Sequence, residues 1–181
     1  MLTVVGMGPA GLQWLIPAAR EAIAAAEALV GGSRHLQQFP DFAGERFALG
    51  ADMPALLAWI EARTGRRVVV LASGDPLFYG IGTRLIAHFG RERVQVIPGI
   101  SAVQYLCARA GIDMNDMWLT SSHGRAVSFD ALAAHRKVAM VTDGQKLGDD
   151  AHFVELPPGH QWIQIDLGRP CKIYAITLWH Y

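Results

Sequence analysis

The chain has 181 residues, with 16 basic and 16 acidic side chains, and 51% of its residues are hydrophobic. That length and hydrophobic fraction suit a globular protein with a buried core and exclude a disordered tail. The balanced charge is unlike that of a nucleic-acid-binding surface, and the apolar runs are too short to cross a membrane. The N-terminus carries no secretion signal, and the two cysteines lie in unrelated contexts. We therefore expect a cytoplasmic protein that binds neither nucleic acid nor membrane.

Strand-like and helix-like segments alternate over residues 1–145. This pattern predicts an α/β fold with a mainly parallel open sheet flanked by helices. The strongest strand is residues 68–72, whose continuous apolar character predicts a central position with both faces covered. Further strands are predicted near residues 2–5, 29–30, 94–97, 117–120 and 138–142, and helices over 10–27, 54–63, 81–89, 101–110 and 129–135.

The character of the sequence changes after Gly144. Residues 162–167 alternate apolar and polar side chains, a turn signal follows, and residues 173–178 have the composition of a second strand. The alternation predicts an antiparallel β-hairpin. We therefore predict three parts, which are an α/β lobe over 1–112, the start of a truncated second lobe over 113–145, and an atypical tail over 146–181.

The first glycine-rich corner, Gly6-Met7-Gly8-Pro9-Ala10-Gly11, follows the first predicted strand. It matches the dinucleotide-binding pattern G-x-G-x-x-G, and a tight turn with no ligand is the alternative. Pro9 argues against a dinucleotide, because it removes a backbone N–H that would contact pyrophosphate. The second strand also ends in Gly31-Gly32, where a ribose-binding carboxylate would be expected.

The second corner, residues 73–80, follows the strongest strand. In an open α/β sheet, ligands bind at the carboxyl ends of central strands. Gly74 allows close approach of a flat ligand to the backbone, and Pro76 stiffens the loop. The Asp75 carboxylate has two interpretations, which are accepting a hydrogen bond from a ribose hydroxyl or an amine, and capping the following helix.

The third corner, residues 97–102, follows the next strand. Ser101 is in position to cap the helix that begins there, and it could also face a ligand. The three corners all stand at strand ends. We therefore predict that they line one crevice along a single edge of the sheet.

In order and spacing, these corners resemble the tetrapyrrole-methylase family. The stretches that carry the resemblance are residues 4–11, 72–77 and 96–102. Within the family, residues 29–34 and 119–125 resemble the branch that methylates carbon 5 of precorrin macrocycles in cobalamin biosynthesis, the cobalt-precorrin-7 and precorrin-6Y C5-methyltransferases. The resemblance covers about residues 1–145.

The resemblance implies two α/β lobes with S-adenosylmethionine, the methyl donor, in the cleft between them. It implies a precorrin or cobalt-precorrin substrate, a homodimer, and a separate partner for methylation and decarboxylation at carbon 15. The cofactor contacts that it implies are Pro9, Ser73, Gly74, Asp75, Phe78, Ser101 and Ala102. The candidate substrate contacts are Gly8, Arg34, His123 and Arg125. Arginine forks suit the peripheral carboxylates of the macrocycle, and ordinary solvated loop charges are the alternative.

No residue is assigned a catalytic role and no metal site is expected, because an activated methyl donor needs in-line positioning more than a side-chain nucleophile. Residues 155–181 resemble a fragment of a discoidin-like, galactose-binding domain, which is too short to form a β-sandwich. Two alternative functions stay open. One is a non-catalytic remnant or fusion product, and the other is a carbohydrate-binding or interaction module formed by residues 155–181.

Overall fold

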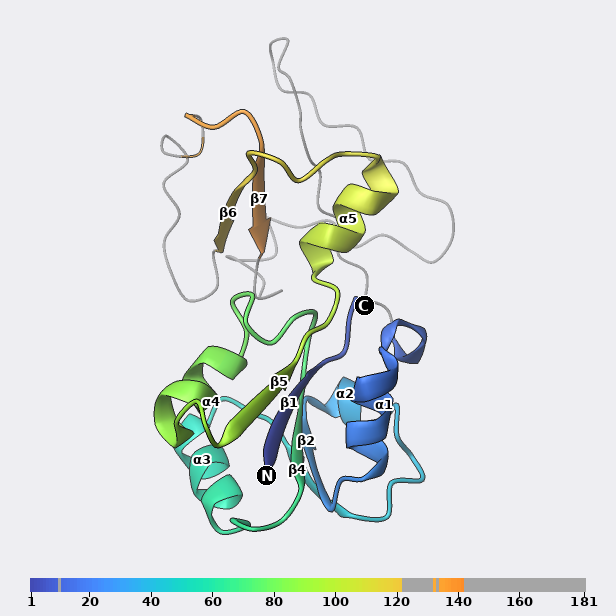
Figure 1. The fold of residues 1–181 in the computed structure, drawn as a ribbon, viewed down its shortest axis with the longest axis vertical. Coiled ribbons are helices and arrows are strands. Elements are labelled where there is room, and N and C mark those ends of the chain that lie inside the picture. The colour runs from blue at the N-terminus through green and yellow to red at the C-terminus, as the bar shows by residue number, and fades with distance from the viewer. Residues whose placement is uncertain (10, 122–131, 133, 142–181) are drawn as a thin grey trace, which may run out of the picture. The chain divides into compact units, whose positions relative to one another are not determined.

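The computed structural model describes residues 1–9, 11–121, 132 and 134–141. The chain separates into two compact units, Met1–Met114 and Asn115–Tyr181. Figure 1 shows the helices and strands of the described residues. Within the described residues, no helix is both long and apolar enough to cross a membrane.

The first unit is built on a five-stranded sheet in the order β3-β2-β4-β1-β5, and every strand pair in it is parallel. The strands are β1 (Leu2–Gly6), β2 (Ala28–Gly31), β3 (Glu45–Ala48), β4 (Val68–Ala72) and β5 (Val94–Ile97). All five residues of β4 are buried. The predicted central strand is therefore confirmed, as is the mainly parallel α/β fold.

Helices cover both faces of this sheet, with α1 and α2 on one side and α3 and α4 on the other (Figure 1). Because successive strand residues point to opposite faces, Val70 packs in the cluster that contains Leu56 and Leu85, and Leu71 packs in the cluster that contains Ile23. The helices of the unit are α1 (Pro17–Ala24), α2 (Ser33–Leu36), α3 (Met53–Glu61), α4 (Gly82–Phe89) and α5 (Ala102–Ala110), with a short 3-10 segment, η1 (Leu12–Trp14).

The predicted helix over 10–27 is wrong in its first half. Leu15 and Ile16 are extended, with ψ of 125° and 157°, and α1 begins only at Pro17. Proline disfavours the helical conformation in the residue before it, whereas its fixed φ and missing N–H suit the first turn of a helix. The helical spacing of apolar residues therefore extends across Pro17, although the backbone is helical in α1 only from Pro17 onward.

Two short elements, α2 and β3, were not predicted from the sequence. The strand β3 reads Glu-Arg-Phe-Ala, and three of its four residues are exposed. Among the described strands, it lies at one end of the sheet and pairs with β2 alone. An edge strand of this kind is specified by its neighbour, because its own apolar pattern is weak.

In the second unit, β6 (Trp118–Ser121) and β7 (Val138–Val141) pair in parallel, with Trp118 opposite Val138. Both strands were predicted from the sequence within one residue of these bounds. Of the predicted helix at 129–135, residues 129–131 and 133 lie outside the described residues. The predicted hairpin and the tail over 146–181 lie entirely outside them.

Candidate functional site

The glycine-rich corners meet at the carboxyl edge of the first unit's sheet. The Gly8 N–H donates to the Gly74 carbonyl at 3.3 Å, and these two glycines form an antiparallel bridge. Next to it, the Met7 N–H donates to the Ala72 carbonyl at 2.8 Å. The loop after β1 is thus joined by backbone bonds to the loop after β4.

The third corner lies against the other two through glycine backbone. A Cβ placed on Gly99 would lie 2.3 Å from the Gly74 carbonyl oxygen, and one placed on Gly6 would lie 2.5 Å from the Gly99 nitrogen. Real side chains do not approach backbone atoms this closely. Glycine is needed at Gly6 and Gly99 because three chain segments pass too near one another for any side chain.

Asp75 connects the second and third corners. Its Oδ1 accepts a hydrogen bond from the Leu77 N–H at 2.8 Å, and its Oδ2 accepts one from the Gly99 N–H at 3.1 Å. The helix α4 begins at Gly82 with Ile81 as its N-cap, so the interpretation of Asp75 as a helix cap is wrong. The carboxylate instead joins two loops that are 24 residues apart in the sequence.

Ser101 forms a capping box at the start of α5, which confirms the predicted cap. Its Oγ accepts from the Gln104 N–H at 3.1 Å, and the Gln104 Oε1 accepts from the Ser101 N–H at 2.8 Å. Ser101 is buried, while Ala102 at the first helical position is exposed. By helix geometry the N–H of Ala102 has no carbonyl one turn earlier to bond. A backbone donor is therefore placed at the edge where the corners meet.

An aromatic contact joins the first corner to α5, and sequence reasoning missed it. The Trp14 and Tyr105 rings meet edge to face, with centroids 5.3 Å apart. A Cβ on Gly8, whose φ is +70°, would lie 2.8 Å from the Trp14 Cβ. No local pattern marks these two residues as partners, because they are brought together only by the fold.

The residues proposed as cofactor contacts all lie in the three corners, and Ala102 is also the first residue of α5. Pro9 and Gly74 are half-buried, as is Phe78, which packs edge to face on Tyr79 with centroids 5.1 Å apart. Ser73 is exposed at the end of β4, and its Oγ lies 3.5 Å from His35 Nε2.

The proposed substrate contacts are only partly described. Arg34 lies on α2, just after the carboxyl end of β2, and is exposed. Its neighbour His35 is half-buried, and its pKa is lowered from the ordinary 6.5, first by burial and second by the Arg34 charge. His123 and Arg125 lie outside the described residues.

The structure does not favour a dinucleotide site at the first corner. In that motif a helix begins directly at the glycine loop and directs its N–H groups at pyrophosphate. Here α1 begins at Pro17, after η1 and two extended residues. Among the residues that the structure describes, no group of three potential metal ligands of the His, Cys, Asp or Glu type comes together.

The sequence profile of the Tetrapyrrole (Corrin/Porphyrin) Methylases matches residues 1–154. The chain belongs to the tetrapyrrole methylase family. Among tetrapyrrole methylases of known assignment, it is 75% identical over 145 residues to the cobalt-precorrin-7 C(5)-methyltransferase of Salmonella typhimurium, covering 80% of this chain and 72% of that enzyme.

Solved tetrapyrrole methylase structures share the fold. The precorrin-6Y methylase of Archaeoglobus fulgidus superposes with a TM-score of 0.63 at 26% identity, over 77% of this chain and 72% of that chain. The uroporphyrin-III C-methyltransferase of Thermus thermophilus was solved in complex with S-adenosylhomocysteine. It superposes with a TM-score of 0.60 at 22% identity, over 77% of this chain and 68% of that chain. The predicted family and fold are therefore confirmed.

Proposed function

We propose that the chain transfers a methyl group from S-adenosylmethionine to carbon 5 of a cobalt-precorrin macrocycle in cobalamin biosynthesis. The observation that carries this proposal is the 75% identity to a cobalt-precorrin-7 C(5)-methyltransferase. The convergence of three glycine corners at the carboxyl edge of the sheet supports it, because ligands of open α/β sheets bind there.

The residues at this edge fit S-adenosylmethionine. A Cβ placed on Gly74 would make ordinary van der Waals contact with the third corner, at 3.5 Å from the Ser101 Cα, so Gly74 lies directly beside the start of α5. Gly74 has a φ of +59°, which turns the loop back on itself. Ser73 and Ala102 are small and exposed beside it. We propose that Pro9, Ser73, Gly74, Asp75, Phe78, Ser101 and Ala102 form the cofactor site.

S-adenosylmethionine supplies an activated methyl group on a positively charged sulfur. The residues of the chain then have to bind and orient the methyl donor and to exclude water from the site. We propose that the backbone of Gly74 and the N–H of Ala102 bind the polar parts of the donor, and that the half-buried Phe78 contacts the flat adenine. Positioning of this kind is a large part of catalysis when two reactants must meet in line.

The macrocycle's carboxylates need cationic partners near the same edge. We propose Arg34, His123 and Arg125 for this role, together with close approach to the backbone at Gly8. Arginine forms two parallel hydrogen bonds with a carboxylate, which fixes its orientation as well as attracting its charge. We further propose that the protein acts in the cytoplasm as a homodimer, and that a separate enzyme acts at carbon 15.

The test is a methyl-transfer assay with purified cobalt-precorrin-7 and S-adenosylmethionine. We expect mass spectrometry to find one added methyl group on the macrocycle and one S-adenosylhomocysteine for each methyl transferred. The control omits the methyl donor. A folded chain that binds S-adenosylhomocysteine and leaves the macrocycle unchanged would contradict this function and favour a non-catalytic remnant.

A further inference from the structure

Asp75 is placed to act on the shape of the site rather than on the ligand alone. Each of its two carboxylate oxygens accepts a backbone N–H, at 2.8 Å from Leu77 and at 3.1 Å from Gly99. The first bond closes the turn that contains Asp75 itself. The second reaches across to the loop after β5. The side chain therefore ties two separate corners with one rigid planar group.

The Gly99 bond lies at the tightest point of the edge. Gly99 is held between the Gly74 carbonyl and the backbone of Gly6, with no room for a Cβ. Two residues after Gly99, Ser101 starts the capping box of α5. A Cβ on Gly74 would lie 3.5 Å from the Ser101 Cα and 3.7 Å from the Ala102 nitrogen. A change in the Asp75–Gly99 distance would therefore move Gly74 relative to α5.

We infer that Asp75 is a positioning residue, whose carboxylate clamps the β4 and β5 loops together and so fixes the spacing between Gly74 and the start of α5 before any ligand binds. This inference rests on the proposed function, because that spacing matters only if these loops hold S-adenosylmethionine. Hydrogen bonds from backbone N–H groups to an ionised carboxylate are stronger than neutral ones. They are suited to holding loops that have no side-chain packing between their glycines.

The sharpest variant is Asp75→Asn. An amide side chain has one acceptor oxygen in place of two, so it can serve Leu77 or Gly99 but not both. Its NH2 group then faces the remaining N–H, donor against donor. The matched control is Asp52→Asn, which makes the same chemical change where Asp52 caps α3 by accepting from the Ala55 N–H at 2.9 Å. Asparagine caps helices as well as aspartate does, so this control keeps its bond.

The first measurement is hydrogen exchange at the Gly99 amide of the ligand-free full chain, followed by NMR. In the wild type we expect the Gly99 amide to exchange more slowly than the amide of Gly50, a glycine in an exposed loop. Asp75→Asn should speed exchange at Gly99, and Asp52→Asn should leave it unchanged. A wild-type Gly99 amide that exchanges as fast as that of Gly50 would overturn the clamp without reference to any ligand or variant.

The second measurement is calorimetric binding of S-adenosylhomocysteine, with KM and kcat for S-adenosylmethionine. Loss of one charge-assisted bond should weaken binding and raise KM by about tenfold in Asp75→Asn, with a smaller change in kcat at saturation. Wild-type affinity in Asp75→Asn, with Gly99 exchange increased, would overturn the positioning role. A wild type that protects Gly99 but binds no S-adenosylhomocysteine would overturn the proposed function, and with it the role of the clamp in ligand binding. The slow exchange would still demonstrate the hydrogen bond between Asp75 and the Gly99 amide.

Discussion

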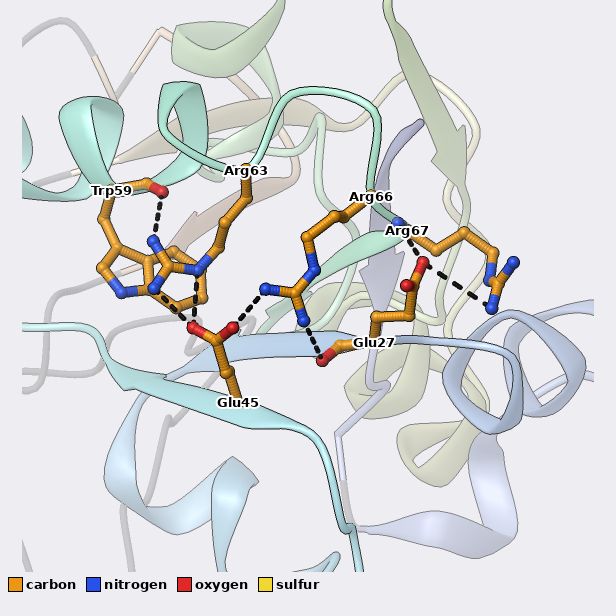
Figure 2. Close-up of polar contacts among 6 residues, drawn as sticks. All are labelled: Glu27, Glu45, Trp59, Arg63, Arg66 and Arg67. Carbon is orange, nitrogen blue, oxygen red and sulfur yellow. Dashed lines mark hydrogen bonds and ion pairs between the residues drawn. The ribbon is translucent and has the colours of Figure 1, made fainter.

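In the first unit, the two ends of the parallel strands, called here the amino edge and the carboxyl edge of the sheet, are connected by different kinds of group. At the amino edge, charged side chains form the connections (Figure 2). Glu45, at the start of β3, accepts from Arg63 Nε at 2.8 Å and also from Arg66, and these two arginines precede β4. Glu27, before β2, accepts from the Arg67 N–H at 2.9 Å. At the carboxyl edge, glycine backbone and the single carboxylate of Asp75 form the connections.

The difference shows what each edge is suited to do. At the amino edge the guanidinium of Arg63 lies 3.6 Å from the Trp59 ring centroid and donates to the Trp59 carbonyl, so its donors are used within the protein. A hollow of about 230 Å³ lies there, lined in part by Arg63, Arg66 and Arg93. The carboxyl edge, by contrast, presents small residues and turned backbone. It is the edge at which we propose that a flat ligand binds, while the charged side chains of the amino edge connect the strands there.

Gly99→Ala should break the carboxyl edge with the largest effect. The new Cβ would lie 2.3 Å from the Gly74 carbonyl oxygen, so the backbone must shift. We expect the free energy of unfolding to fall by about 3 kcal/mol, measured by urea denaturation, and S-adenosylhomocysteine binding to be lost. Gly50→Ala is the control, because its Cβ would meet nothing within 4 Å. An unchanged stability in Gly99→Ala would contradict the close approach of the three corners.

Removing the side-chain cap of α5 or that of α3 should lower stability equally but should weaken ligand binding unequally. Ser101→Ala and Asp52→Ala each delete an oxygen that accepts a backbone N–H at a helix start. Each should cost about 1 kcal/mol of unfolding free energy. Only Ser101→Ala should also weaken S-adenosylhomocysteine binding in calorimetry. Equal affinities in the two variants would remove Ser101 from the proposed site.

Glu45→Gln tests the amino edge through acid unfolding. Hydrogen bonds from Arg66 and then Arg63 hold the pKa of Glu45 below its usual 4.5. Because the folded pKa is lowered, the stabilisation is complete above about pH 4.5 and is lost as the pH falls through the folded value. The variant should lose less stability on acidification, and this difference should shrink in high salt because the group is exposed. Ligand affinity should not change. A weaker affinity in this variant would show that the two edges are coupled.

His35→Gln should give the smallest effect, in a different pH window. Burial and the Arg34 charge lower the pKa of His35, so the folded state disfavours the protonated imidazole that the unfolded chain accepts near pH 6.5. Wild-type stability should therefore fall as the pH drops from about 6.5 to the lowered folded value. The variant should lack this step while keeping the acid step of Glu45. Thermal melts followed downward in pH, first through 6.5 for His35 and then below 4.5 for Glu45, would separate the two steps.

Local rules predicted the parts of the fold that local forces decide. The apolar run of β4 gave a buried central strand, and the serine before α5 gave its cap, because both depend on neighbouring residues. The strand β3 depends on pairing with β2 and carries little signal of its own. Pro17 indicated the start of α1, but the helical spacing of apolar residues on both sides of it favoured one longer helix.

The candidate site was predictable in its glycines and not in its connections. Turn glycines at three strand ends indicated three corners, and parallel topology brought those strand ends to one edge. The bond from Gly99 to Asp75 and the contact of Trp14 with Tyr105 join residues that are far apart in the sequence. Such contacts depend on how the strands pair in the folded sheet, and no single segment of the sequence specifies that pairing.

The most direct test of a ligand site at the carboxyl edge is an NMR titration of the full chain with S-adenosylhomocysteine. We predict saturable shifts of the backbone amides of Gly74, Ser101 and Ala102, with those of Arg66 and Arg67 at the amino edge unmoved. Binding that shifts only the amino-edge amides, or no binding at millimolar ligand, would contradict the assignment of the three glycine corners as the cofactor site.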